Sequence, residues 1–182
     1  MKKIILIFCL IFLIASTSNA QTRTEKTTSL PQQYKEAVTD ILGKLPEVAG
    51  DQATKIMDFA KSLLGVKYRY ASSNPSVGFD CSGFVSYVFK NFGFSGARSS
   101  SDYAAKGKAV KLAEAKVGDV LVFTGTNVKS RRPGHVGIIY SIDENRNIKF
   151  IHSSSGRARG VTITDLEGYY KTRFLKAITV IE

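Results

Sequence analysis

Three side chains in this sequence of 182 residues could act together as a nucleophile, its base and a group that orients the base: Cys81, His135 and His152. Cys81 lies in GFDCSGF, directly after Asp80 and before apolar residues at helical spacing. A cysteine in the first turn of a helix faces unpaired N–H groups and the positive end of the helix dipole. We therefore expect the pKa of Cys81 to lie below its ordinary value of about 8.5. Asp80 is the expected N-cap residue. The same pattern is compatible with a cysteine that only packs in the core.

The chain has two histidines, His135 and His152, on either side of the turn sequence DENRN, residues 143–147. If that turn closes a hairpin, the two imidazoles are opposite or diagonal neighbours, within about 7 to 8 Å. One could then accept the thiol proton while the other orients the first, as in cysteine hydrolases. Metal binding is the alternative, because two imidazoles and a thiolate could hold zinc, although no typical ligand spacing is present.

The start of the chain is typical of a secretory signal peptide. Two lysines precede an apolar run over residues 4–14, and small residues offer a cleavage site before Gln21. An uncleaved anchor helix is the alternative, but the run is short for a bilayer span of about 20 residues. Cleavage would remove Cys9 and two lysines and lower the net charge from +11 to +9. Cys81 would then have no partner for an internal disulfide.

Composition limits the class of protein. About 160 mature residues suit one domain with its own core. The basic excess favours acidic surroundings such as an anionic cell-wall polymer, while export argues against nucleic acid as a partner. We expect a monomer in the periplasm or cell envelope, or secreted, with no stable membrane insertion after signal cleavage.

Apolar spacing predicts helices first and strands afterwards. Residues 21–29 are a polar leader. Helical spacing marks 31–45, 51–64 with Asp51 as cap, and 81–92 with Gly93 as terminator, while 71–78 are expected to form a loop. Short β-rich runs follow at 119–123, 135–142, 148–153, 161–166 and 174–181. This order predicts an α+β domain with helices packed on an antiparallel sheet.

Four segments resemble, in order and spacing, the NlpC-type papain-like cysteine peptidases of bacterial cell walls: GVKYRYASSNPSVGFDCSGFVSYVFKNFG, VGDVLVF, GHVGIIY and FIHSSSG. The resemblance covers residues 51–182, after a signal peptide (1–20) and a leader with a short helix (21–50). It implies a papain-like NlpC-type fold with the catalytic helix on an antiparallel sheet. It also implies hydrolysis of amide bonds in peptidoglycan stem peptides without a cofactor. Many relatives cut between D-glutamate, through its γ-carboxyl, and the following diamino acid.

The resemblance also implies roles for individual residues. Cys81 would be the nucleophile, His135 the general base and His152 the residue that holds the His135 ring. Tyr68 matches the tyrosine whose hydroxyl helps the Cys81 N–H at the oxyanion site. The residues expected to hold the stem peptide are Asp80, Ser82, Arg98, Ser100 and Ser101.

The sequence departs from the family pattern beside the cleft. Relatives commonly have two glycines soon after the tyrosine, where this chain has Ala71 and Ser72, whose side chains would narrow the cleft. Three basic residues before His135 could form a rim to the cleft: Lys129, Arg131 and Arg132. The same site would also suit an N-acetylmuramoyl-L-alanine amidase. A non-catalytic cell-envelope binding module is the third interpretation.

Overall fold

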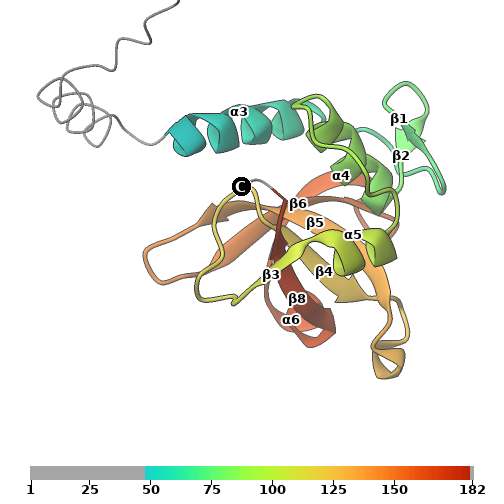
Figure 1. Ribbon diagram of the computed structural model, residues 1–182. Coiled ribbons are helices and arrows are strands. Elements are labelled where there is room, and N and C mark those ends of the chain that lie inside the picture. The colour runs from blue at the N-terminus through green and yellow to red at the C-terminus, as the bar shows by residue number, and fades with distance from the viewer. Residues whose placement is uncertain (1–47, 181–182) are drawn as a thin grey trace, which may run out of the picture. The chain divides into compact units, whose positions relative to one another are not determined.

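The computed structural model describes residues 48–180 (Figure 1). The expected signal peptide, the polar leader and the helix predicted over 31–45 lie outside these residues. Within the described part of the chain, no helix is long and apolar enough to cross a membrane.

Two helices form the upper layer in Figure 1: α3 (Val48–Ser62) and α4 (Cys81–Lys90). The predicted helix over 81–92 is confirmed, and Gly93 has the left-handed φ of +85° that suits a terminator. The predicted start of the earlier helix is wrong, because α3 begins at Val48 and Asp51 lies inside it. Apolar spacing marks the buried face of a helix and does not mark its first turn.

Six strands form one sheet in the order β3-β8-β4-β5-β6-β7, and every neighbouring pair is antiparallel. The five predicted strands correspond to β4 (Val120–Thr124), β5 (Pro133–Ile142), β6 (Ile148–Ser154), β7 (Gly160–Asp165) and β8 (Phe174–Thr179). The predicted α+β class with an antiparallel sheet is confirmed.

The pattern missed several short elements: β3 (Lys108–Val110), α5 (Ser100–Lys106), α6 (Gly168–Arg173) and the single turn η1 (Val128–Ser130). The predicted loop over 71–78 contains a small hairpin of β1 (Ser73–Asn74) and β2 (Gly78–Phe79). Elements this short carry too few apolar residues to show a period.

Each face of the sheet has its own apolar cluster. One cluster joins α3, α4 and α5 to the strands, with Ile56, Phe84 and Val88 fully buried. The other cluster contains Phe123 and Phe150, with α6 packed against it. The strands therefore hold the start of α4 on one side and α6 on the other.

The turn between β5 and β6 closes the predicted hairpin, and the β5–β6 register contains a β-bulge. Ser141 pairs with Lys149 near the turn, whereas Ile139 pairs with Phe150. Tyr140 is therefore an extra residue on β5. A bulge of this kind changes which side chains share a face beyond it.

Candidate active site

The first turn of α4 presents a partly exposed thiol on a rigid support. Cys81 is the first residue of the helix, and the Asp80 carboxylate accepts a hydrogen bond of 2.5 Å from the Gly83 N–H, as predicted for an N-cap. Behind the turn, Phe84 and Val85 are fully buried. Burial of side chains of this size stabilises a fold by about 1.5–3 kcal/mol each. The thiol is thus fixed at the edge of the core.

The pKa of the Cys81 thiol is raised, not lowered. Burial is the largest cause, and the negative charge of Asp80 adds to it. Hydrogen bonds from the Val136 and Ser82 N–H groups act in the opposite direction but are outweighed. The expected lowering is therefore wrong, because it counted the helix N–H groups and left out desolvation of the thiolate. At neutral pH the group is a thiol and needs a base.

The two histidines form a hydrogen-bonded pair, which confirms that they are neighbours. Nε2 of His135 lies 2.8 Å from Nδ1 of His152. The rings meet edge to face, with centroids 4.9 Å apart and an interplanar angle of 86°. Because Nε2 of His135 is used in this bond, Nδ1 is the nitrogen left for another partner.

A third strand continues this pair. His152 is fully buried, and its Nε2 lies 3.0 Å from Oγ1 of Thr164 on β7. The pairing partner of His152 is Thr162, so Thr164 is a diagonal neighbour on the same face. His135, His152 and Thr164 thus form one line of polar contacts across β5, β6 and β7.

Both imidazoles are neutral at neutral pH. Burial lowers the pKa of His152 to about 3, and the positive charge of Arg173 adds to this effect. Burial is also the largest cause that holds the pKa of His135 well below its ordinary value of 6.5, and the nearby His152 ring and the positive charge of Arg173 lower it further. A neutral imidazole can accept a proton, so His135 has the charge state of a general base.

Arg173 is a buried cation that the sequence pattern did not reveal. Its guanidinium donates to the Thr124 carbonyl at 2.7 Å and to the Tyr169 hydroxyl at 2.5 Å, and it stacks 4.6 Å from the Tyr169 ring centre. From α6, the neighbouring Tyr170 packs edge-on against His152, with centroids 5.2 Å apart. The helix α6 therefore supports the histidine pair and sets its electrostatic environment.

The Cys81 thiol contacts β5 at Val136, the residue that follows the expected base His135. The Val136 N–H is hydrogen-bonded to the Cys81 sulfur, so the thiol lies next to the backbone of His135. Within residues 48–180, no hydrogen bond joins the sulfur to the His135 ring itself. Such catalytic contacts are often long without substrate and shorten in the substrate complex.

Tyr68 lies beside the thiol, as expected. Its N–H donates to the Arg159 carbonyl at 2.8 Å, and it bridges Phe79, two residues before Cys81. Burial raises the pKa of the Tyr68 hydroxyl, and the nearby Cys81 and Asp80 side chains raise it further. The phenol is therefore protonated and can donate to an oxyanion. The Ser155 hydroxyl hydrogen-bonds to it.

Three of the five expected substrate-binding residues form one cluster. The Arg98 guanidinium makes a bidentate pair with Asp80, at 3.0 and 2.9 Å, and also donates to the Ser82 hydroxyl at 3.1 Å. Ser82 in turn donates to Asp80 at 3.1 Å. Ser100 and Ser101 instead lie in the first turn of α5, and no hydrogen bond joins them to this cluster in the described part of the chain.

Thr164 and Ser155 were missed because neither residue belongs to a recognisable motif. One signal for Thr164 was available: in VTITDL, the two threonines alternate with Val161 and Ile163. Alternation puts both hydroxyls on the face opposite the apolar residues. If this strand pairs with the strand of His152, both threonine side chains lie on the same face of the sheet as the His152 ring.

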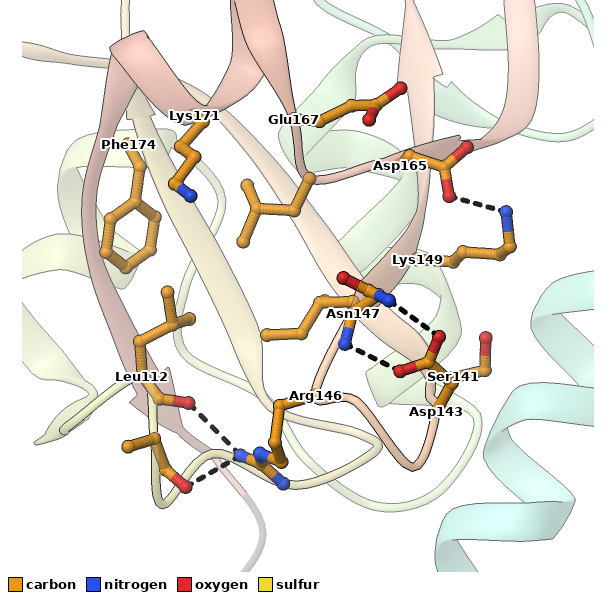
Figure 2. A pocket seen from close by; sticks show the side chains of 13 residues that line it. Leu112, Ser141, Asp143, Arg146, Asn147, Lys149, Asp165, Glu167, Lys171 and Phe174 are labelled. Carbon is orange, nitrogen blue, oxygen red and sulfur yellow. Dashed lines mark hydrogen bonds and ion pairs between the residues drawn. The ribbon is translucent and has the colours of Figure 1, made fainter.

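A separate cavity of about 970 Å³ lies at the other end of the sheet (Figure 2). It contains neither Cys81 nor a histidine. Several of its polar groups are already paired: Lys149 with Asp165 at 2.5 Å, and Asn147 with Asp143 at 2.8 Å. We assign this cavity no part in the chemistry of the histidine pair.

The metal-binding alternative finds no further support. Among the described residues, no group of three or more His, Cys, Asp or Glu side chains could hold a metal ion. Two of the four imidazole nitrogens face each other in the His135–His152 bond and are not available to a shared ion.

Comparisons with known proteins agree with this geometry. A model described as the NlpC/P60 family matches residues 65–179. The chain is 33% identical over 133 residues to the murein DD-endopeptidase MepS/murein LD-carboxypeptidase of Escherichia coli (strain K12), covering 72% of this chain and 64% of that protein. It is 36% identical over 131 residues to a gamma-DL-glutamyl hydrolase of Bacillus subtilis (strain 168), covering 69% and 30%.

Among solved structures, an NlpC/P60 family protein from Bacillus cereus ATCC 10987 matches with a TM-score of 0.62 and 27% identity, over 71% of this chain and 40% of that one. The match therefore spans less than two thirds of the length of each of these proteins.

Proposed function

Because this chain belongs to the NlpC/P60 family, we propose that it is an exported cysteine endopeptidase that hydrolyses amide bonds in peptidoglycan stem peptides. One observation carries the proposal. His135 and His152 form a neutral, hydrogen-bonded pair, and His135 lies on the strand that contacts the partly exposed Cys81. This is the nucleophile, base and orienter set of a cysteine hydrolase. The catalytic domain spans residues 51–182 and acts as a monomer after removal of residues 1–20.

In the first step, Nδ1 of His135 takes the Cys81 proton while the sulfur attacks the substrate carbonyl carbon. The negative charge on the carbonyl oxygen is stabilised by the Cys81 N–H and the Tyr68 hydroxyl. His135 then gives the proton to the amide nitrogen, the C–N bond breaks, and the free amine leaves a thioester on Cys81.

In the second step, His135 deprotonates a water molecule that attacks the thioester carbonyl. The C–S bond breaks, the thiol is restored with the proton from His135, and the product acid gives its remaining proton to solvent and leaves as a carboxylate. Burial of the His152 ring keeps it neutral throughout, so it serves as an acceptor and not as a second base.

These steps require particular tautomers. If Nδ1 of His135 accepts the thiol proton, Nε2 must carry hydrogen and donate to Nδ1 of His152. His152 must then carry its hydrogen on Nε2 and donate to Thr164. Thr164 is thus the last member of a chain of hydrogen bonds that fixes the orientation of the base.

For the substrate, we propose the bond between D-glutamate, through its γ-carboxyl, and the following diamino acid. The B. subtilis relative is named a gamma-DL-glutamyl hydrolase, which supports this choice. The Arg98 side chain is still 44% exposed while paired with Asp80, so it can also contact the stem peptide. With Ser82, these residues would form the polar wall of the substrate site, and Ser100 and Ser101 would line its edge.

Digestion of purified muropeptides by the mature protein, followed by mass spectrometry, tests the proposal. A new amine on the diamino acid is expected, and Cys81→Ala should abolish it. Other products would name other activities: free stem peptides would indicate an amidase, and cleaved cross-links would indicate the DD-endopeptidase activity named for MepS. No new amine from the wild type would contradict the proposal.

The non-catalytic alternative predicts a different result. A cell-envelope binding module would bind muropeptides, leave them intact and bind equally well as Cys81→Ala. Turnover that disappears with Cys81→Ala while binding is retained would contradict that alternative.

A further inference from the structure

Three segments next to the candidate active site carry only positive charge. Residues 66–79, 125–134 and 155–160 contain no Asp or Glu. Seven exposed cations lie on them, and we call this set the basic rim: Lys67, Arg69, Lys129, Arg131, Arg132, Arg157 and Arg159. The sequence suggested a rim from three of these residues, and the fold adds the other four.

Strand order brings the three segments together. In an antiparallel sheet, the β4–β5 and β6–β7 connections lie at the same end, which is the end where β5 begins near His135 and β6 finishes near His152. Strand spacing puts these connections about 10 Å apart. Residues 66–79 are joined to the β6–β7 connection by the hydrogen bond that the Tyr68 N–H donates to the Arg159 carbonyl.

Within residues 48–180, no ion pair neutralises the charges of the basic rim. The ion pairs that join two residues of this part of the chain are Arg98–Asp80, Lys111–Glu114 and Lys149–Asp165, and none includes a rim residue. At physiological salt the Debye length is about 8 Å, so the charges of neighbouring segments act together on an extended anion. Unpaired like charges repel one another, and an anionic partner would remove this cost.

We propose that the basic rim binds carboxylates of the stem peptides that neighbour the one being cut. The enzyme then acts preferentially on polymeric peptidoglycan over a single soluble muropeptide. This inference rests on the proposed function. It follows from continuity: residues 125–134 lead directly into His135 on β5, and residues 155–160 directly follow β6, which carries His152, so a ligand on the rim lies next to the peptide held in the cleft. The arginine fork also matches the two oxygens of a carboxylate.

A triple variant tests the rim without touching the candidate catalytic residues. Lys129→Gln, Arg132→Gln and Arg157→Gln alter exposed side chains. Arg131 and Arg159 are kept, because they have positive φ values that a substitution could disturb. The matched control removes three charges from exposed lysines elsewhere: Lys108→Gln, Lys116→Gln and Lys171→Gln. A charge-conserving triple, Lys129→Arg, Arg132→Lys and Arg157→Lys, checks that charge and not shape is responsible.

Hydrolysis of intact sacculi is compared with hydrolysis of one purified muropeptide at low salt. The rim variant is expected to lose about tenfold in rate on sacculi and to act normally on the muropeptide, because charges around a cleft raise encounter rates by tenfold or more. High salt should remove the difference. The control and charge-conserving triples should match the wild type. Equal rates of rim variant and wild type on sacculi, or equal losses on both substrates, would overturn the proposal.

Binding of Cys81→Ala to sacculi tests the rim separately from catalysis. Binding should survive removal of phosphodiester polymers by acid, fall when the carboxylates are converted to amides, and fall in the rim variant of Cys81→Ala. Binding that depends on the phosphodiester polymers, or equally tight binding to a single-stranded oligonucleotide, would identify another partner and overturn the proposal. If the wild type bound sacculi through their carboxylates but cut no amide bond, the proposed function would be refuted and the role of the basic rim in binding would stand.

Discussion

His135 and His152 share one face of the sheet because of the extra residue Tyr140 on β5. Beyond the bulge, Ile138 pairs with Ile151, so the register places Gly137 opposite His152. His135 is two residues from Gly137 and therefore points to the same side as His152. Without the bulge, Ile138 would stand opposite His152, and the His135 side chain would lie on the other face.

Gly137 provides the space for this pair. A Cβ at this position would lie 2.6 Å from Cδ2 of Phe150 and 3.0 Å from Cβ of His152. We expect Gly137→Ala to lower the free energy of unfolding by about 1–3 kcal/mol, as overpacking does, and to reduce kcat by displacing the His152 ring. Denaturant unfolding and muropeptide turnover measure the two effects.

Gly125→Ala is the matched control, because a Cβ there would meet only the Gly134 Cα, at 4.0 Å. It should leave both quantities unchanged. If Gly137→Ala had the stability and turnover of the wild type, the expectation would be contradicted, because β5 and β6 would then accommodate the methyl group without displacing the histidines.

The hydroxyl of Thr164 should matter for catalysis more than for folding. Thr164→Val keeps the shape and removes the acceptor for Nε2 of His152. Since a hydrogen bond of this kind contributes about 0.5–1.5 kcal/mol, we expect kcat to fall by up to about tenfold with KM unchanged. Thr164→Ser should restore most of the loss. A kcat equal to that of the wild type, or a loss confined to KM, would argue against a role in positioning His152.

The motifs around Cys81 and the two histidines predicted the centre of the site, because short-range spacing fixes a helix cap and a hairpin. Tyr140 could not be identified as a bulge from the sequence, since a single extra residue leaves the alternation on either side intact. The contribution of α6 was also unpredictable. Arg173 and Tyr170 reach the histidines only through the packing of distant segments.

The raised pKa of Cys81 and the lowered pKa of His135 predict a neutral resting pair, not an ion pair. The base form of His135 then persists below pH 6.5, and the acid limb of kcat/KM should lie below that value. Iodoacetamide should alkylate Cys81 slowly at pH 6 and faster as the pH rises. A chain that begins at Gln21 is the sample to use, since it lacks Cys9. Rapid alkylation at pH 6 would contradict the neutral pair.

The buried His152 and the partly buried His135 should make stability depend on pH. In the folded state their pKa values lie below 6.5, so between these values the unfolded chain binds more protons. Stability is therefore complete above pH 6.5 and falls as the pH decreases, by up to about 1.4 kcal/mol per pH unit for each histidine. Urea unfolding between pH 5 and 7 measures the slope, and His152→Gln should reduce it. An unchanged slope in His152→Gln would contradict neutral burial of His152.

Ala71 occupies a backbone conformation that favours glycine. Its φ is +58°, in the left-handed region. A left-handed conformation costs an L-residue about 1–2 kcal/mol, whereas glycine adopts it freely but loses about 0.5–1 kcal/mol more entropy on folding. We expect Ala71→Gly to raise the free energy of unfolding by up to about 1 kcal/mol, measured by urea unfolding. Ala71 is exposed, and if its side chain narrows the cleft as the family resemblance implies, the same variant should improve turnover of bulkier stem peptides. Lower stability in Ala71→Gly would show that the alanine side chain makes favourable contacts that outweigh the backbone strain.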